Sequence, residues 1–171
     1  FDRAGTALGT VGAPDEKDLT APRLSPDDRR VAVQRTLQGN VDIWLLDADR
    51  TTRVTFDPST DRFPLWSPDG SRIVFDSSRT GHRDLYEKPA NGAGSDALLV
   101  ASPQDKVATH WSADGRFLLY ASLDPQAAYD LWAVPLDGDR TPFVWLKTPF
   151  DERRAVFSPE GRWVAYQSNE S

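Results

Sequence analysis

A four-residue turn motif occurs four times in the chain, and each copy separates two short apolar runs. The copies are spaced 42, 45 and 46 residues apart. They read Ser25-Pro26-Asp27-Asp28, Ser67-Pro68-Asp69-Gly70, Ser112-Ala113-Asp114-Gly115 and Ser158-Pro159-Glu160-Gly161. A second signature follows the first three copies by 17 or 18 residues, at Asp42-Ile43-Trp44, Asp84-Leu85-Tyr86 and Asp130-Leu131-Trp132. A fixed period in the forties with several short strands in each period predicts propeller blades.

The second repeat illustrates the strands that we expect within one blade. A first strand over residues 62–66 runs into the Ser-Pro-Asp-Gly turn, whose proline and glycine suit a tight hairpin. The next strand, Ile73-Val74-Phe75, is apolar at successive positions, which indicates burial on both faces. Its counterparts are Val31-Ala32-Val33, Phe117-Leu118-Leu119-Tyr120 and Trp163-Val164-Ala165-Tyr166.

We therefore predict an all-β fold, a β-propeller made of four-stranded antiparallel blades, with residues 1–171 as a single domain or fragment. Residues 20–57, 62–101 and 106–147 are expected to form three whole blades, the outer strand of the first running from Arg53 to Phe56. Residues 1–12 read as the outer half of a blade and residues 152–168 as an inner half.

The two half-blades need a partner, because an unpaired apolar edge strand exposes backbone donors and apolar side chains. The chain could close on itself as four blades, or two chains could exchange halves as a homodimer. A third alternative is excision from a parent of more blades, in keeping with a chain that starts at Phe1 and contains no Met. We favour the symmetric homodimer, because a two-fold ring leaves no edges.

Composition excludes several classes of function. A net charge of −6 and a pI near 4.9 argue against nucleic acid as a partner, because phosphate binding needs a basic face. No apolar stretch approaches the roughly 20 residues of a membrane span, so we expect no membrane insertion. The absence of Cys removes disulfides and thiol chemistry.

The sequence does not predict a catalytic site, a metal site or a cofactor. The turn aspartates lie on separate blades, so we expect them to build turns and not to bind calcium. The chain has two histidines, His82 and His110, with no zinc-binding spacing between them. No Gly-x-Ser-x-Gly elbow is present. We therefore expect no enzymatic activity.

The loops that join second to third strands, and one blade to the next, should lie on one face of the ring, where propellers usually bind partners. Polar and aromatic residues of these loops are the candidate contacts for a protein or peptide, with Tyr129 and Phe150 foremost, because aromatic residues recur at interface centres. The candidate set is Arg79, His82, Arg83, Asp105, Lys106, Tyr129, Phe150 and Arg153.

The repeat, an apolar strand, Ser-Pro-Asp-Gly, an apolar strand, a polar loop and Asp-Leu-Trp/Tyr, resembles TolB-type and WD40-like bacterial propeller repeats over residues 20–168. Stretches such as residues 41–47, 66–75 and 161–171 resemble the propellers C-terminal to some bacterial transmembrane Ser/Thr kinases. Asp28 stands where the pattern has Gly, and Ala113 where it has Pro. Asp tolerates the left-handed conformation of such a turn better than most residues, so the fold prediction stands.

The resemblance implies a binding or gating module, as in the periplasmic TolB protein and the non-catalytic propeller of prolyl-oligopeptidase-type peptidases. We expect a non-catalytic scaffold that binds a protein or peptide as the sensor segment of a larger bacterial protein, in an extracytoplasmic or periplasmic location. The alternatives are the gating propeller of a serine peptidase and a self-assembling propeller fragment.

Overall fold

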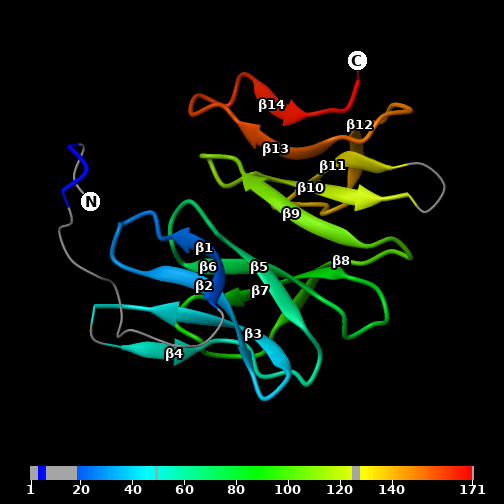
Figure 1. Cartoon of the computed structure of the whole chain (residues 1–171). Helices are drawn as coiled ribbons and strands as arrows, with labels where there is room; N and C mark the ends of the chain where they lie inside the picture. The colour runs from blue at the N-terminus through cyan, green and yellow to red at the C-terminus, as the bar shows by residue number, and fades with distance from the viewer. Residues whose placement is uncertain (1–3, 7–18, 49, 125–127, 171) are drawn as a thin grey trace.

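The structure, a computed structural model, describes residues 4–6, 19–48, 50–124 and 128–170 of the chain. Within these residues it consists of antiparallel strands joined by turns and loops, with no helix (Figure 1). Figure 1 shows the strands gathered into sheets that follow one another in chain order, from the cyan sheet to the red one. The predicted all-β propeller class is confirmed.

Among the described residues three sheets have four strands and the last has two, and within each sheet every strand pairs with its neighbours in chain order. The first sheet contains β1 (Leu19–Leu24), β2 (Val31–Leu37), β3 (Asn40–Leu46) and β4 (Thr51–Arg53). The second contains β5 (Asp61–Trp66), β6 (Arg72–Ser77), β7 (Asp84–Pro89) and β8 (Ala97–Val100). The third contains β9 (Lys106–Trp111), β10 (Phe117–Leu123), β11 (Tyr129–Pro135) and β12 (Phe143–Leu146), and β13 (Arg153–Phe157) pairs with β14 (Val164–Gln167).

The middle strands of the sheets are buried on both faces, which explains why their apolar residues follow one another without alternation. On β6, Ile73 and Phe75 pack into a cluster with residues of the first sheet, such as Ile43. Val74, between them, points the other way and packs with Leu118 of the third sheet. Successive side chains of a strand face opposite sides of its sheet, so a sheet enclosed by two neighbours needs apolar residues on both.

Among the described residues, the last sheet packs against a neighbouring sheet on one side only. Val164 and Ala155 belong to the cluster that joins this sheet to β10 and β11. In contrast, Trp163 is 73% exposed, whereas the residues at its position in the preceding sheets, Arg72 and Phe117, are half-buried. Tyr166 is 44% exposed and packs edge-on against Trp145 of β12, with 6.1 Å between the ring centroids. β14 is thus an edge strand with an uncovered apolar face among the described residues.

In the first three turn motifs the serine hydroxyl donates to the acidic residue, and in the fourth the Ser158 hydroxyl accepts the Trp163 N–H at 3.2 Å. In the second copy the Ser67 hydroxyl donates to Asp69 Oδ1 at 2.5 Å and accepts the Arg72 N–H at 2.9 Å. Hydrogen bonds from Ser67 and Ser71 lower the pKa of Asp69 to about 2. The fourth turn residue is left-handed, with φ of 68° at Gly70 and 58° at Asp28. Asp28 therefore adopts the conformation that glycine adopts in the other copies.

The outer strand of the first sheet departs from expectation. Arg53 to Phe56 were expected to form it, whereas β4 covers Thr51–Arg53. The ladder ends there because the N–H groups of Val54 and Thr55 both point to the Ile43 carbonyl, while the Thr55 hydroxyl accepts the Ile43 N–H at 3.0 Å. This bulge ends regular pairing, and Phe56 is left 62% exposed.

The N-terminal half-blade expected over residues 1–12 lies outside the described residues, except for residues 4–6, which are exposed. The division into a single domain with two complementary half-blades, and the homodimer, remain predictions.

The turn geometry predicts opposite effects for two substitutions at equivalent positions. Gly70→Ala should lower the free energy of unfolding by about 1 kcal/mol, because a Cβ is strained at this φ although it would meet only ordinary contacts. Asp28→Gly should leave the free energy of unfolding unchanged or raise it, because the backbone at Asp28 is left-handed and glycine adopts this conformation without strain. Urea unfolding of both variants measures this, and a neutral Gly70→Ala would contradict it.

Candidate functional site

The first strands of the four sheets contact one another in series, β1 with β5, β5 with β9 and β9 with β13. Each of them has an irregularity in its pairing with the next strand of its own sheet. In three of them a residue other than glycine is left-handed: Ala21 with φ of 50°, Phe63 with 52° and Arg154 with 54°. All three stand four positions before the turn serine. Such a conformation costs about 1 kcal/mol or more, and residues that retain it concentrate at functional sites.

A cavity of about 610 Å³ lies along these strands, and every one of the four sheets contributes to its wall. We call this cavity the funnel. Its lining residues are Arg23, Phe63, Arg83, Val107, Ala108, Thr109, Ala121, Tyr129, Arg153, Arg154 and Val156. The volume falls within the 300–1,000 Å³ typical of ligand pockets.

The funnel wall is basic although the chain is acidic. Four arginines line it, and none of the described lining residues is acidic. Arg23 and Arg154 are both exposed, and neither forms an ion pair with a carboxylate in the described part of the chain. The remaining two, Arg83 and Arg153, are each held by one aspartate.

Two equivalent clamps position these held arginines. Asp105 accepts the Arg83 N–H at 2.9 Å and its Nε–H at 3.0 Å, and these bonds lower the pKa of Asp105. In the next repeat, Asp151 accepts the Nε–H of Arg153 at 2.8 Å and the N–H of Tyr129 at 3.2 Å. The bond from Arg153 lowers the pKa of Asp151. Each clamp thus ties the start of a third strand to the first strand of the following sheet.

The clamps leave part of each guanidinium available. Arg83 and Arg153 both use Nε for their aspartate, and their terminal nitrogens donate no hydrogen bond to any described residue. The Arg153 guanidinium lies over the Tyr129 ring, 4.2 Å from its centroid, which fixes its plane. The funnel therefore presents pre-positioned donors, and its chemistry is the binding of negatively charged groups.

Of the residues that the sequence suggested for partner binding, the structure brings Arg83, Tyr129 and Arg153 together in the funnel wall. Asp105 supports the wall through the clamp on Arg83. His82 is exposed in the loop before Arg83. Phe150 is half-buried in the loop before β13, where its N–H donates to the Thr148 hydroxyl at 3.1 Å.

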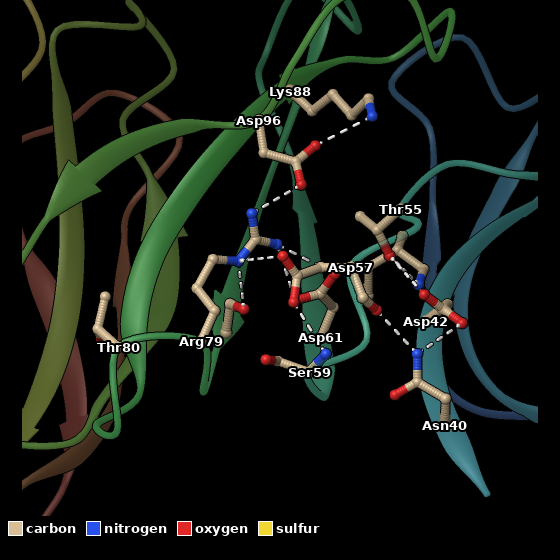
Figure 2. A network of polar contacts seen from close by, with 12 residues as sticks. Asn40, Asp42, Thr55, Asp57, Ser59, Asp61, Arg79, Thr80, Lys88 and Asp96 are labelled. Carbon is tan, nitrogen blue, oxygen red and sulfur yellow. Dashed lines mark hydrogen bonds and ion pairs between the residues drawn. The ribbon is translucent and has the colours of Figure 1, made fainter.

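Two suggested residues serve the fold, Lys106 in the interior and Arg79 at a half-buried position. Lys106 is 1% exposed, and its Nζ donates to Asp84 at 2.7 Å and to two backbone carbonyls. Arg79 is the centre of the network in Figure 2, where it contacts Asp61 at 3.1 Å and Asp96 at 2.9 Å. Both are loop positions by sequence, but their charges are already neutralised, so we leave them out of the candidate site.

Sequence reasoning missed the other wall residues, among them Arg23, Phe63 and Arg154, which belong to first strands and not to loops. A usable signal was present. Phe63 and Arg154 stand at the same repeat position, four before a turn serine, and Arg23 stands two before one, so the repeat places all three on first strands.

A second cavity, of about 390 Å³, is lined by turn residues of all four repeats, including Pro26, Pro68 and Pro159. Arg23 lines both cavities. Among the described residues no group of His, Asp and Glu is arranged to hold a metal ion. The same residues contain no helix with the length and apolar character required to cross a membrane.

Comparison with known proteins places the chain in a family. Residues 10–171 match the model of the TolB β-propeller domain. The chain belongs to this family. This confirms the TolB-type resemblance, whereas the kinase-like context of the repeat remains a prediction.

Individual relatives agree with the family assignment of this TolB-type propeller. It is 32% identical over 101 residues to tricorn protease homolog 1 of Streptomyces coelicolor, covering 57% of this chain and 10% of that protein. It is 32% identical over 94 residues to the Tol-Pal system protein TolB of Anaeromyxobacter dehalogenans, covering 54% of this chain and 21% of that protein. The structure of a putative TolB from Agrobacterium tumefaciens superposes with a TM-score of 0.75 at 21% identity, covering 90% of this chain and 55% of that one. The chain thus spans a tenth to a fifth of these curated relatives.

The buried carboxyl group of Asp76 predicts that the stability of this TolB-type propeller depends on pH. Asp76 is 1% exposed, neither of its oxygens has a hydrogen-bond partner, and its nearest cation, Arg62, is 3.6 Å away. Burial raises the pKa of Asp76 to about 7, against the opposing influence of Arg62 and Arg83. The folded state therefore keeps this proton at pH values where the unfolded chain has lost it.

The stability that depends on this proton is present below about pH 4 and is lost as the pH rises to about 7. Asp76→Asn should remove that loss. Relative to the parent, the variant should gain about 1 kcal/mol or more in free energy of unfolding between pH 5 and pH 8. Urea unfolding at both pH values measures the gain, and a stability difference that does not change with pH would contradict the assignment.

Proposed function

We propose that this TolB-type propeller is a non-catalytic binding module, and that the funnel is where it holds a segment of a protein or peptide. The observation that carries the proposal is the funnel itself, a concave site of about 610 Å³ to which all four sheets contribute. Clefts of this kind, with a few well-placed polar groups on an apolar wall, are the usual place for a ligand.

Two features support binding over chemistry. The titratable side chains of the described wall are four arginines and Tyr129, and the arginines stay protonated and are poor acids or bases at neutral pH. The relatives named TolB belong to a Tol-Pal system by name, and the sequence resemblance connects such proteins with the periplasm. We therefore propose an extracytoplasmic location and a role as the sensor or interaction segment of a larger bacterial protein.

The gating propeller of a serine peptidase is the second candidate. The match to tricorn protease homolog 1 favours it, since that protein is named as a protease and the matched region covers 10% of its length. A peptidase assay on the full-length gene product separates the two candidates. Hydrolysis of peptides by that product supports gating, whereas binding without hydrolysis supports the sensor.

Self-assembly is a third candidate, favoured by the uncovered face of β14. Trp163 exposes apolar surface there, and a second chain that supplies an outer half-blade would cover it. Light scattering on the purified chain tests this: a two-chain mass supports the homodimer and a single-chain mass contradicts it.

A matched pair of substitutions tests the funnel as the binding face. Val156 and Val144 are strand valines with 41% and 44% exposure, but Val156 lines the funnel and Val144 lies on the outer strand β12. Peptides selected by phage display on the parent chain should bind Val156→Trp about tenfold more weakly, because the indole fills the cavity, and Val144→Trp with unchanged affinity. Equal binding by both variants would place the peptide elsewhere, and failure to select any peptide would contradict peptide binding.

A further inference from the structure

We propose that the funnel recognises carboxylate groups, so that the partner segment it takes is a short acidic peptide. This inference rests on the proposed function, because it names the chemistry of the ligand at the same site. The geometry points to Arg83 and Arg154 as the main contacts, with Arg23 and Arg153 beside them in the wall.

The charge of the wall carries the first step. Arg23 and Arg154 line the funnel without a carboxylate partner among the described residues, and no described acidic side chain lines the cavity. Other exposed arginines lie outside this cavity, whether they reach a carboxylate, as Arg140 reaches Glu87 at 3.0 Å, or form no ion pair with a described residue, as in the case of Arg162. A concave site with one sign of charge attracts the opposite charge more strongly than a flat surface does.

The pre-positioning of the donors carries the second step. Asp105 and Asp151 hold Arg83 and Arg153 by Nε, which leaves the terminal nitrogens for a ligand. Arginine binds carboxylates through paired N–H donors, and a guanidinium held in place loses little freedom when it does so. Arg154 is placed on the wall by a left-handed backbone, a conformation that the fold retains against its cost.

The surroundings of the funnel favour a short peptide over a nucleic acid. Asp105 and Asp151 flank the arginines, and the whole chain carries a net charge of −6. An extended polyanion needs a continuous basic track and would meet these acidic groups outside the funnel. A peptide of a few residues can place its carboxylates inside and keep the rest of its length neutral.

The test uses fluorescence anisotropy with short labelled peptides and the whole chain. The first probe alternates glutamate with glycine and has both ends blocked, and the second carries glutamine at each glutamate position. A third, the glutamine peptide with a free C-terminus, separates side-chain carboxylates from a chain-end carboxylate. A single-stranded oligonucleotide of equal charge serves as the fourth probe.

The protein variants separate binding from folding. Arg83→Gln and Arg154→Gln should weaken the glutamate peptide about tenfold each, the effect of one lost charge-assisted contact. Arg154→Gly should weaken it equally while its melting temperature stays equal or rises, because glycine accepts the left-handed φ. Arg162→Gln is the matched control: Arg162 is an exposed arginine between β13 and β14 that does not line the funnel, and its loss should change affinity less than twofold.

Binding of the glutamate peptide supports the inference and indicates that side-chain carboxylates are recognised. Binding of only the glutamine peptide with a free C-terminus also supports it and indicates that the chain-end carboxylate is recognised. The inference is overturned if the blocked glutamine peptide binds as tightly as the glutamate peptide, if Arg162→Gln weakens binding as much as Arg154→Gln, or if the oligonucleotide binds more tightly. Peptides selected by display that bind in the funnel without acidic residues would overturn this inference and leave the proposed function standing. If no peptide binds at all, both fail.

Discussion

The two-sided burial of the middle strands is the constraint on which the rest of the fold depends. Val74 and its neighbours on β6 face opposite sheets, so this strand reaches full burial only when the first and third sheets are both in place. Stability is then a sum of contacts between consecutive repeats, as in other repeat proteins. The same stacking brings β1, β5, β9 and β13 side by side, and the funnel exists because these four strands meet.

The first strands pair irregularly and line the funnel, whereas the middle strands pair regularly and form the core. Three of the first strands hold a left-handed residue four positions before the turn serine. At Phe63 and Arg154 that residue lines the funnel. The regular ladder between second and third strands, which continues without a shift in β6 and β7, supplies the rigidity that keeps the strained positions in place. Changes in the funnel can therefore alter binding at little cost to the core.

Much of the fold follows from local sequence, because a Ser-x-Asp-Gly turn is determined by its own side chains. The first turn forms although Asp28 replaces the glycine of the motif, since the Asp28 backbone adopts the left-handed conformation. The end of β4 could not be foreseen, because it depends on a hydroxyl of Thr55 that reaches across to Ile43. In the same way, Lys106 is a loop residue by sequence, but Asp84, 22 residues away, turns it inward. Arg154 was missed because nothing in its own residue type marks a left-handed position.

The funnel also depends on the last, incomplete sheet, since β13 supplies Arg153, Arg154 and Val156 to its wall. This sheet is attached to its neighbour through β9 and β10 and through single bonds such as that from the Phe157 N–H to His110 Nδ1, at 3.3 Å. A ligand that contacts Arg83 and Arg154 together bridges the second and last sheets. Any ligand that binds only the assembled form stabilises it, so binding in the funnel would be coupled to attachment of the last, two-stranded sheet. The acidic peptide that pairs with the funnel arginines would then also stabilise the packing of β13 and β14 against the third sheet.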